Sequence, residues 1–198
     1  MRKVTYAGVV TTFAGSGSTS YADGAATAAA IFYPTGLAVD TMRYVYVADY
    51  TNRIRKITPT GVVTTLAGSG SATIADGYGT SASFYYPRGV AVDSQGLVYV
   101  ADYINERVRV ISPAGYVSTL AGTASAGYAD GAGTSATFYY PIGVAVDSKG
   151  NVYETDTIYG VIRKISQTGE YVVRSITCCH RFMKPSTLDM LLHIRNAV

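Results

Sequence analysis

The sequence predicts an all-β fold built from repeated units of about 50 residues. Residues 45–49 read VYVAD and return 53 residues later at 98–102, and after a further 54 residues they return, degraded to VYETD, at 152–156. The composition agrees, because 18 Tyr, 21 Gly and abundant Val suit β-rich repeats. Self-similarity at this period marks a fold in which each unit buries its apolar faces against its neighbours.

The middle copy shows what one unit contains. Four short runs rich in small, β-branched and apolar residues alternate with turns of Gly, Pro, Asn and Asp: 89–93 (GVAVD), 97–102 (LVYVAD), 107–112 (RVRVIS) and 116–121 (YVSTLA). This pattern predicts an antiparallel four-stranded meander. Four strands per unit of about 50 residues is the spacing of a propeller blade, so we expect a partial β-propeller of about three blades. The first run has the smallest side chains, as an innermost strand would.

The repeated motifs also carry a family resemblance. Pro87-x-Gly-Val-Ala-Val-Asp, then Gly96-x-Val-Tyr-Val-Ala-Asp, then Asn105-x-Arg-Val-Arg resembles the NHL repeat, and copies beginning at Pro34 and Pro141 fit it with decreasing fidelity. The resemblance covers roughly residues 2–173. It implies a β-propeller, usually six-bladed, that presents a binding surface. Members serve as protein-binding, RNA-binding and sensor modules, and related propellers include lyases and lactonases, so the fold alone does not choose a function.

The repeats divide the chain into a propeller segment and a tail. We place repeats near 34–68, 87–122 and 141–173, an N-terminal half-blade at 1–15, and a divergent basic tail at 174–198. The half-blade follows from residues 2–15, which match 55–68 and therefore correspond to the outer two strands of a blade. Arg174-Ser175-Ile176 stands where the preceding copy has Leu120-Ala121-Gly122, so we expect the last outer strand to fail.

An open array of this size leaves two blade faces uncovered, which natural sheets avoid. One solution is a homodimer that closes a six-bladed ring, in which the N-terminal strand pair of each chain completes the third blade of its partner. The other is that the chain is a fragment of a longer propeller protein, without independent function. The foreign composition of the tail favours the fragment.

Charge argues against a nucleic-acid partner. The net charge of +3 comes from residues 174–198, whereas residues 1–173 carry 12 basic and 12 acidic side chains. A nucleic-acid surface ordinarily has a basic excess. We interpret the basic residues on the predicted strands as a solvated outer row that discourages edge pairing: Arg53, Arg55, Lys56, Arg107, Arg109, Arg163 and Lys164.

No stretch reaches the length of a membrane span, and the N-terminus lacks the apolar core of a signal peptide, so the compartment stays undetermined. Adjacent Cys178 and Cys179 lack the spacing of a zinc site and are expected to be free thiols. A capping-box pattern and the spacing of leucines favour a short amphipathic helix at about 186–196.

The long loops favour one side of the blades as the binding face. Three connections of about 20 residues each contain Ala-Asp-Gly and a small-residue stretch that ends in Phe, which we interpret as one helical turn. Long connectors on a rigid scaffold often carry binding residues. We expect a protein or peptide ligand to contact Tyr33, Tyr86, Arg88 and Tyr140, because aromatic and Arg anchors commonly carry such contacts.

The repeated aspartates are interpreted as structural turn and cap residues: Asp40, Asp49, Asp93, Asp102, Asp147 and Asp156. They can accept backbone N–H groups, or pair with the following Arg53 and Arg107. No histidine occurs before the tail, which disfavours hydrolase and zinc-lyase chemistry. We therefore expect no catalytic residue, metal or cofactor. The alternative is a metal-dependent lactonase-like or lyase-like propeller enzyme, for which Glu154 is the one candidate inward acid.

Overall fold

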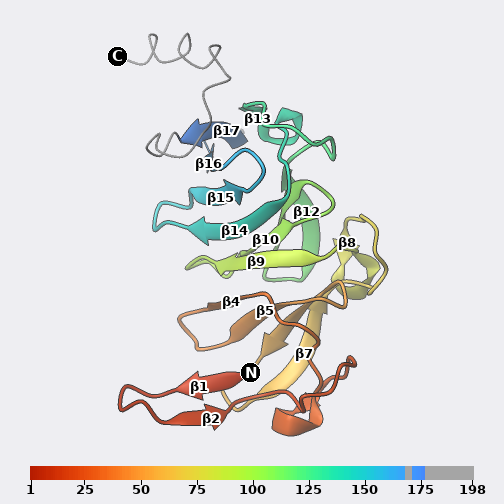
Figure 1. The fold of residues 1–198 in the computed structure, drawn as a ribbon, viewed down its shortest axis with the longest axis vertical. Helices are drawn as coiled ribbons and strands as arrows, with labels where there is room; N and C mark the ends of the chain where they lie inside the picture. The colour runs from red at the N-terminus through yellow and green to blue at the C-terminus, as the bar shows by residue number, and fades with distance from the viewer. Residues whose placement is uncertain (168–170, 177–198) are drawn as a thin grey trace.

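Three five-stranded antiparallel sheets and one two-stranded sheet form the part of the chain that the structure describes (Figure 1). The computed structural model describes residues 1–167 and 171–176. The helix expected at 186–196 and the two cysteines lie outside the described residues.

Each five-stranded sheet contains the predicted meander, and we call the sheets the first, second and third blades. The first blade has β4 (Gly36–Val39), β5 (Val45–Asp49), β6 (Arg53–Ile57) and β7 (Val62–Ala67). The second has β9 (Pro87–Val92), β10 (Val98–Asp102), β11 (Arg107–Ile111) and β12 (Tyr116–Ala121). The third has β14 (Pro141–Val146), β15 (Val152–Asp156), β16 (Val161–Gln167) and β17 (Tyr171–Ile176). The half-blade consists of β1 (Arg2–Val4) and β2 (Val10–Thr12).

Each blade has a fifth strand that the sequence pattern did not predict. The long loop before each blade first runs along the outer edge of that blade, where β3 (Gly24–Ala25), β8 (Gly77–Tyr78) and β13 (Gly131–Ala132) pair with β7, β12 and β17. A 3-10 turn follows in each loop: η1 (Ala26–Ala28), η2 (Gly79–Ser81) and η3 (Gly133–Ser135). The expected helical turn is present, but its loop belongs to the outer edge of the sheet.

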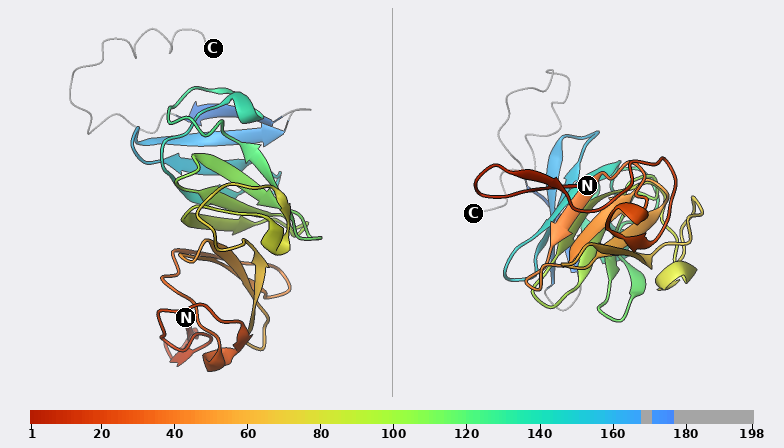
Figure 2. Two further views of the ribbon diagram at one scale, coloured as in Figure 1. Left: turned by 90° about the vertical axis from the view of Figure 1, so that its right-hand side faces the viewer. Right: turned by 90° about the horizontal axis from the view of Figure 1, so that it is seen from below.

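The blades stack in chain order along the long axis of the molecule (Figures 1 and 2). The inner strands β4, β9 and β14 lie side by side. Gly36 and Gly89 explain the glycine of the Pro-x-Gly motif, because a Cβ at either position would overlap the backbone of the next inner strand, at the carbonyl oxygens of Arg88 and Ile142. Only glycine allows backbones to approach this closely.

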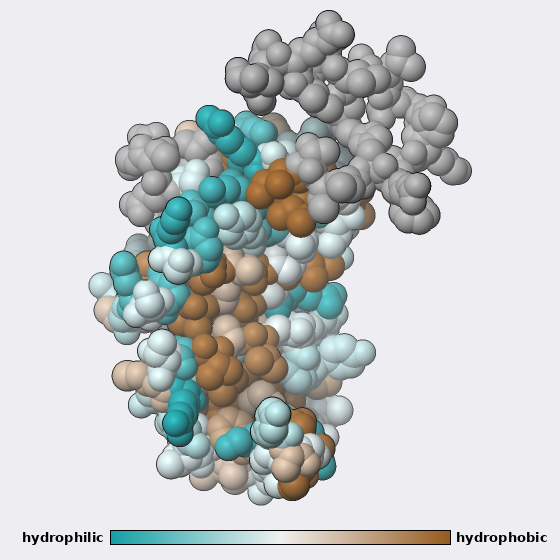
Figure 3. All heavy atoms as spheres, turned by 90° about the vertical axis from the view of Figure 1, so that its left-hand side faces the viewer, coloured by the Kyte–Doolittle hydropathy of each residue, from teal (hydrophilic) through white to brown (hydrophobic). Residues whose placement is uncertain are grey.

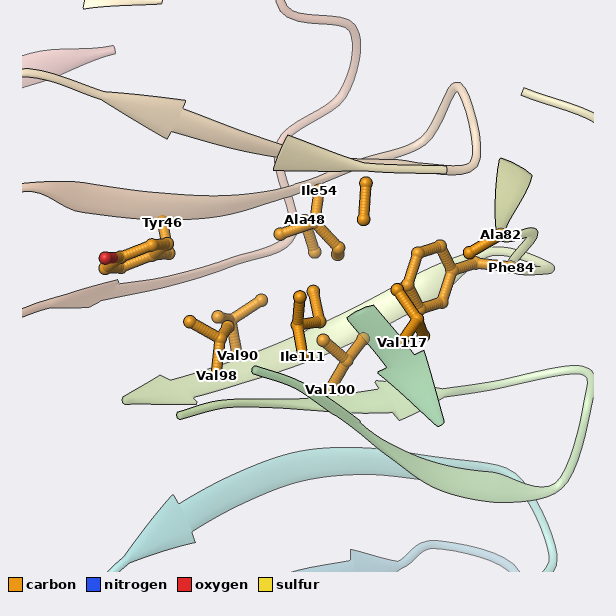
Figure 4. Packing of buried hydrophobic residues seen from close by; sticks show 11 residues of the cluster. Tyr46, Ala48, Ile54, Ala82, Phe84, Val90, Val98, Val100, Ile111 and Val117 are labelled. Carbon is orange, nitrogen blue, oxygen red and sulfur yellow. The ribbon is translucent and has the colours of Figure 1, made fainter. Parts of the chain in front are cut away.

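The apolar core lies between the blades, not within them. Figure 4 shows Tyr46, Ala48 and Ile54 of the first blade facing residues of the second, among them Val98, Val100 and Ile111. A second cluster joins the second and third blades, and a smaller one joins the half-blade to the first. A blade therefore buries its apolar faces only when a neighbour is present.

The expectation that the last outer strand fails is wrong. β17 pairs with β16 as far as Ile176, and Val173 is buried in the core between the second and third blades. Ser175 occupies the place that Thr65 has in the first blade, because its N–H and Oγ donate to the Asp130 carboxylate, at 2.8 and 3.0 Å, as those of Thr65 donate to Asp23. The outer edge of the third blade is occupied by β17 and β13, so it offers no place for the N-terminal strand pair of a partner chain.

Candidate binding surface

The long loops, β8 and β13 gather on one side of the stack, on the right in Figure 1, together with the loops that join the second and third strands of the blades. The short turns lie on the opposite side. Figure 3 shows this side, on which a band of apolar surface runs beside polar residues. The tyrosines and Arg88 predicted from the sequence come from the long-loop side.

A buried arginine attaches each long loop to its blade. In the first blade, Arg55 Nη1 donates to Asp49 Oδ2 and to the Ala30 carbonyl, both at 3.0 Å. Arg55 Nη2 donates to Asp23 Oδ1 at 2.6 Å and to the Ala22 carbonyl at 3.0 Å. The strand and the loop thus share one guanidinium, whose planar fork suits two carboxylates at once.

The same arrangement recurs in the other blades. Arg109 lies 3.1 Å from Asp102 and 2.5 Å from Asp76, and Arg163 lies 2.9 Å from Asp130 but 3.7 Å from Asp156. All three arginine side chains are fully buried, so the interpretation of them as a solvated row is wrong. The strand-end aspartates accept backbone N–H groups, Asp49 that of Thr51 and Asp102 that of Tyr85, at 2.9 and 2.8 Å. The arginines with which they pair are Arg55 and Arg109, and not Arg53 and Arg107.

The aspartates before the short turns accept hydrogen bonds from their own turns. Asp93 Oδ1 accepts the N–H groups of Gln95 and Leu97 at 2.9 Å, and Asp93 Oδ2 accepts the Tyr99 hydroxyl at 3.0 Å. In the third blade, hydrogen bonds led by the Asn151 side chain lower the pKa of Asp147 to about 2. These carboxylates therefore act within the turns.

Tyrosines from adjacent blades stack on the long-loop side. Tyr86, which precedes the inner strand of the second blade, stacks on Tyr50 of the first blade with ring centroids 4.3 Å apart and planes inclined by 11°. The backbone of Tyr86 is left-handed, with φ of 51°. Its N–H donates to Asn52 Oδ1 at 2.8 Å, which holds this uncommon conformation.

The next interface repeats this geometry. Tyr140 has φ of 59° and stacks on Tyr103 with centroids 4.7 Å apart, and its N–H donates to Glu106 Oε2 at 2.5 Å. Arg88 places its guanidinium 4.9 Å from the centroid of the Tyr103 ring. Arg88, Tyr103 and Tyr140 therefore form one cationic and aromatic cluster.

Tyr33 precedes these stacked tyrosines in the chain. It has φ of 48°, is 70% exposed, and its ring centroid lies 5.8 Å from that of Tyr50. The four predicted residues thus fall into two groups, because Tyr33 and Tyr86 both meet Tyr50, whereas Arg88 and Tyr140 both meet Tyr103.

Sequence reasoning missed Tyr50 and Tyr103, which link the predicted residues. The signal was available, because each directly follows the aspartate of a VYVAD motif and the third copy has Thr157 there instead. Thr157 donates its hydroxyl to the Tyr140 carbonyl at 2.8 Å. We call the set Tyr33, Tyr50, Tyr86, Arg88, Tyr103 and Tyr140 the tyrosine ladder.

Glu154, the candidate inward acid, lies in the core between the second and third blades. It is fully buried, and neither carboxylate oxygen has a hydrogen-bond partner. Burial raises its pKa to about 9, and the nearby Asp156 adds to the rise. Burial likewise raises the pKa of Glu106 to about 7. In the part of the chain that the structure describes, no three or more His, Cys, Asp or Glu side chains are placed to hold a metal ion.

A separate hollow of about 320 Å³ lies between the first and second blades at the short turns. Its lining includes Tyr44, Lys56, Asp40 and Asp93, so it is distinct from the tyrosine ladder. Among the described residues, no helix has the length and apolarity to cross a membrane.

Comparison with known proteins agrees with this fold. The NHL repeat matches residues 84–111. Protein SUPPRESSOR OF QUENCHING 1, chloroplastic, from Arabidopsis thaliana is 34% identical over 91 residues, which are 46% of this chain and 9% of the plant protein. A solved structure of a protein of unknown function from Bacteroides thetaiotaomicron is 31% identical with a TM-score of 0.62, over 71% of this chain and 35% of that chain. The chain thus spans only a small part of these relatives.

A likeness to an enzyme is weaker. Virginiamycin B lyase from Staphylococcus aureus has a TM-score of 0.53 and 15% identity, over 89% of this chain and 48% of that chain, which shows the fold alone. The structural neighbours are β-propeller proteins, which confirms the predicted fold class. The match of the NHL repeat to residues 84–111 and the sequence relative confirm the NHL resemblance.

Proposed function

Because this chain has the fold of a partial β-propeller and matches the NHL repeat, we propose that it is a non-catalytic recognition module that binds a protein or peptide ligand through its long-loop face. The tyrosine ladder is the observation that carries this proposal. It joins aromatic faces, phenol hydroxyls and one guanidinium on a scaffold of stacked blades.

The backbone geometry supports recognition beyond simple packing. Tyr33, Tyr86 and Tyr140 all have positive φ, a conformation that is strained for a bulky residue. Such strain persists only where surrounding contacts enforce it, and it concentrates at functional sites. Here the backbone bonds to Asn52 and Glu106 hold the second and third of these tyrosines.

The chemistry of the ladder defines the ligand class. Tyrosine faces contact proline, aromatic and aliphatic side chains at low entropic cost, and Arg88 offers a cation for one carboxylate. We therefore propose a peptide segment that carries apolar or aromatic residues and one acidic side chain.

Selection from a phage-displayed library of short random peptides, followed by calorimetric titration, tests the proposal. We expect the selected peptides to lose about tenfold or more in affinity on Tyr86→Ala or Arg88→Ala, since each such anchor typically contributes more than about 1 kcal/mol. Tyr78→Ala is the matched control, because Tyr78 lies outside the ladder, is 64% exposed on the outer edge of the second blade and packs edge-to-face against Tyr116.

The competing explanation is that the tyrosines only join the blades. In that case Tyr86→Ala lowers thermal stability and leaves peptide affinity unchanged, which would refute the recognition surface. A library that yields no peptide sensitive to either ladder variant would refute it too.

A further inference from the structure

The hollow between the first and second blades, which we call the inter-blade pocket, lies on the short-turn side of the molecule, the side that faces the viewer in Figure 3. One wall consists of Tyr44, Tyr46, Lys56 and Leu66 of the first blade, and the short turns of the second blade, at 93–96 and 112–113, form the other. Its volume of about 320 Å³ is at the small end of the range for ligand pockets, about 300–1,000 Å³. The pocket therefore suits a small molecule.

Lys56 lines this pocket with an ammonium group that has no acceptor. Its Nζ lies 4.4 Å from the centroid of the Tyr44 ring and 5.6 Å from that of Tyr46, so two aromatic rings hold the cation in place. Within residues 1–167 and 171–176 the ammonium forms no ion pair or hydrogen bond. Its three N–H donors are therefore available to a ligand.

The next interface between blades shows that packing does not require this cation. Val110 takes the register position of Lys56 in the second blade, since it pairs with Tyr99 as Lys56 pairs with Tyr46. Leu97 takes the position of Tyr44, and Leu97 and Val110 both pack against the core between the second and third blades. Apolar residues suffice to join two blades at this position, so a cation beside aromatic rings is a special feature of the first interface.

The two aspartates of the lining restrict the charge of the ligand. Asp40 accepts the Tyr44 N–H at 2.8 Å and the Tyr46 hydroxyl at 3.1 Å, and Asp93 is likewise hydrogen-bonded within its own turn. Burial, followed by the hydrogen bond to Asp40, raises the pKa of Tyr46 to about 12, so its hydroxyl keeps the proton that it donates. Two carboxylates near the pocket oppose a doubly charged anion, whereas a single negative charge matches the one ammonium.

Two hydroxyl groups and an apolar side chain add to the pocket. Ser112 Oγ accepts the Tyr116 N–H at 3.1 Å, which leaves its own hydrogen free to donate. Ser94 is exposed, and its hydroxyl has no hydrogen bond within the described part of the chain. Leu66 is only partly buried, whereas its counterpart Leu120 is 3% exposed, so Leu66 offers apolar surface to a ligand.

We propose that the inter-blade pocket binds a small monocarboxylate with an apolar body, such as an arylacetate. The carboxylate lies at Lys56 and accepts hydrogen bonds from Ser94 and Ser112, and the apolar body contacts Leu66 and Pro113. The charge-assisted hydrogen bond orients the ligand, and burial of apolar surface contributes affinity. This site is separate from the tyrosine ladder, so it does not depend on the peptide ligand proposed above.

Proton NMR with saturation transfer from the whole chain to phenylacetate measures this binding. We expect saturable binding of one phenylacetate per chain. Lys56→Met, which removes the ammonium and keeps the length of the side chain, should weaken binding about tenfold or more. Lys164→Met is the matched control, because Lys164 lies 5.9 Å from the Tyr153 ring at the same position of the third blade, and it should leave affinity unchanged.

Two analogues of the same size test the choice of a single carboxylate. Neutral 2-phenylethanol should bind the unchanged chain about tenfold more weakly than phenylacetate, and the two should bind the Lys56→Met chain alike. Phenyl phosphate, as a dianion, should also bind more weakly than phenylacetate. Tighter binding of phenyl phosphate or 2-phenylethanol would overturn the monocarboxylate.

A turn variant tests the site without changing the wall of the first blade. Ser94→Glu places a negative charge beside the pocket and should weaken phenylacetate binding about fivefold or more. Ser148→Glu, at the counterpart position in the third blade, is also exposed and should have no effect. Absence of saturable binding, unchanged affinity for Lys56→Met or Ser94→Glu, or an equal loss in the control variants would each overturn the proposal.

Discussion

Replacing Glu154 by Val is expected to stabilise the protein and to reduce a fall in stability between mildly acidic and neutral pH. Glu154 occupies the place of Val47 and Val100 in the other blades, but both of its oxygens are buried without a partner. An ionised carboxylate in such a site is costly, so the folded protein keeps the group protonated.

The magnitude follows from linkage between protonation and folding. The pKa of Glu154 is raised from 4.5 to about 9 in the folded protein, mainly by burial. Below 4.5 both folded and unfolded chains hold the proton, and the full stability is present. As pH rises toward 9 the unfolded chain ionises first, so stability falls by about 1.4 kcal/mol per pH unit. Between pH 5 and pH 7 this amounts to about 2.5 kcal/mol.

Urea denaturation at a series of pH values, followed by circular dichroism because the chain has no Trp, measures the effect. Glu154→Val should gain stability relative to the unchanged protein as pH rises. Glu154→Gln should gain stability with pH in the same way as Glu154→Val, but it should be less stable than Glu154→Val at every pH, because its amide remains buried without a partner. Burial raises the pKa of Glu106 to about 7 and that of Asp102 to about 6, so these two groups should leave a residual fall in stability that ends near neutrality. Parallel curves for Glu154→Val and the unchanged protein would refute the reasoning.

Two further substitutions test the fold. Arg109→Met should lower the free energy of unfolding by about 3–5 kcal/mol in urea denaturation, because it leaves the buried Asp102 without its cation. A loss below about 1 kcal/mol, as for surface pairs, would contradict the role of Arg109 in attaching the loop to the blade. Gly89→Ala should lower the thermal midpoint strongly, because its methyl group would overlap the Ile142 carbonyl. Gly115→Ala is the comparison, since nothing lies within 4 Å of an added Cβ and only the left-handed φ of 84° opposes the substitution. Equal losses for both variants would exclude the close backbone approach as the cause.

The meander in each blade could be predicted because strand alternation and turn residues are local features of the chain. Residues 98–102 and 107–111 form adjacent strands as expected, and the Pro-x-Gly glycines mark a backbone contact that any copy requires. The failure expected after Val173 did not occur, because Ser175 takes the register position of Thr65 in β7, and the Tyr, Val and Ile side chains of β17 suit a strand that pairs with β16.

The partners of charged residues could not be predicted in this way. Arg55 and Arg53 both alternate with apolar residues on one strand, yet only Arg55 is fully buried. Its partner Asp23 lies 32 residues away, in a loop whose path over the outer edge has no sequence signature. The tyrosine ladder likewise needed the blades to be stacked before Tyr50 and Tyr86 could be recognised as neighbours.

The sequence by itself determined the repeat period, the strands, their order within a blade and the aromatic and basic side chains that precede each inner strand. Those properties depend on residues close together in the chain. Only the tertiary structure decided which arginine meets which aspartate, which tyrosines stack, and that Glu154 is buried without a partner. Those properties depend on how one blade faces the next, and that relation arises from packing between segments far apart in the sequence.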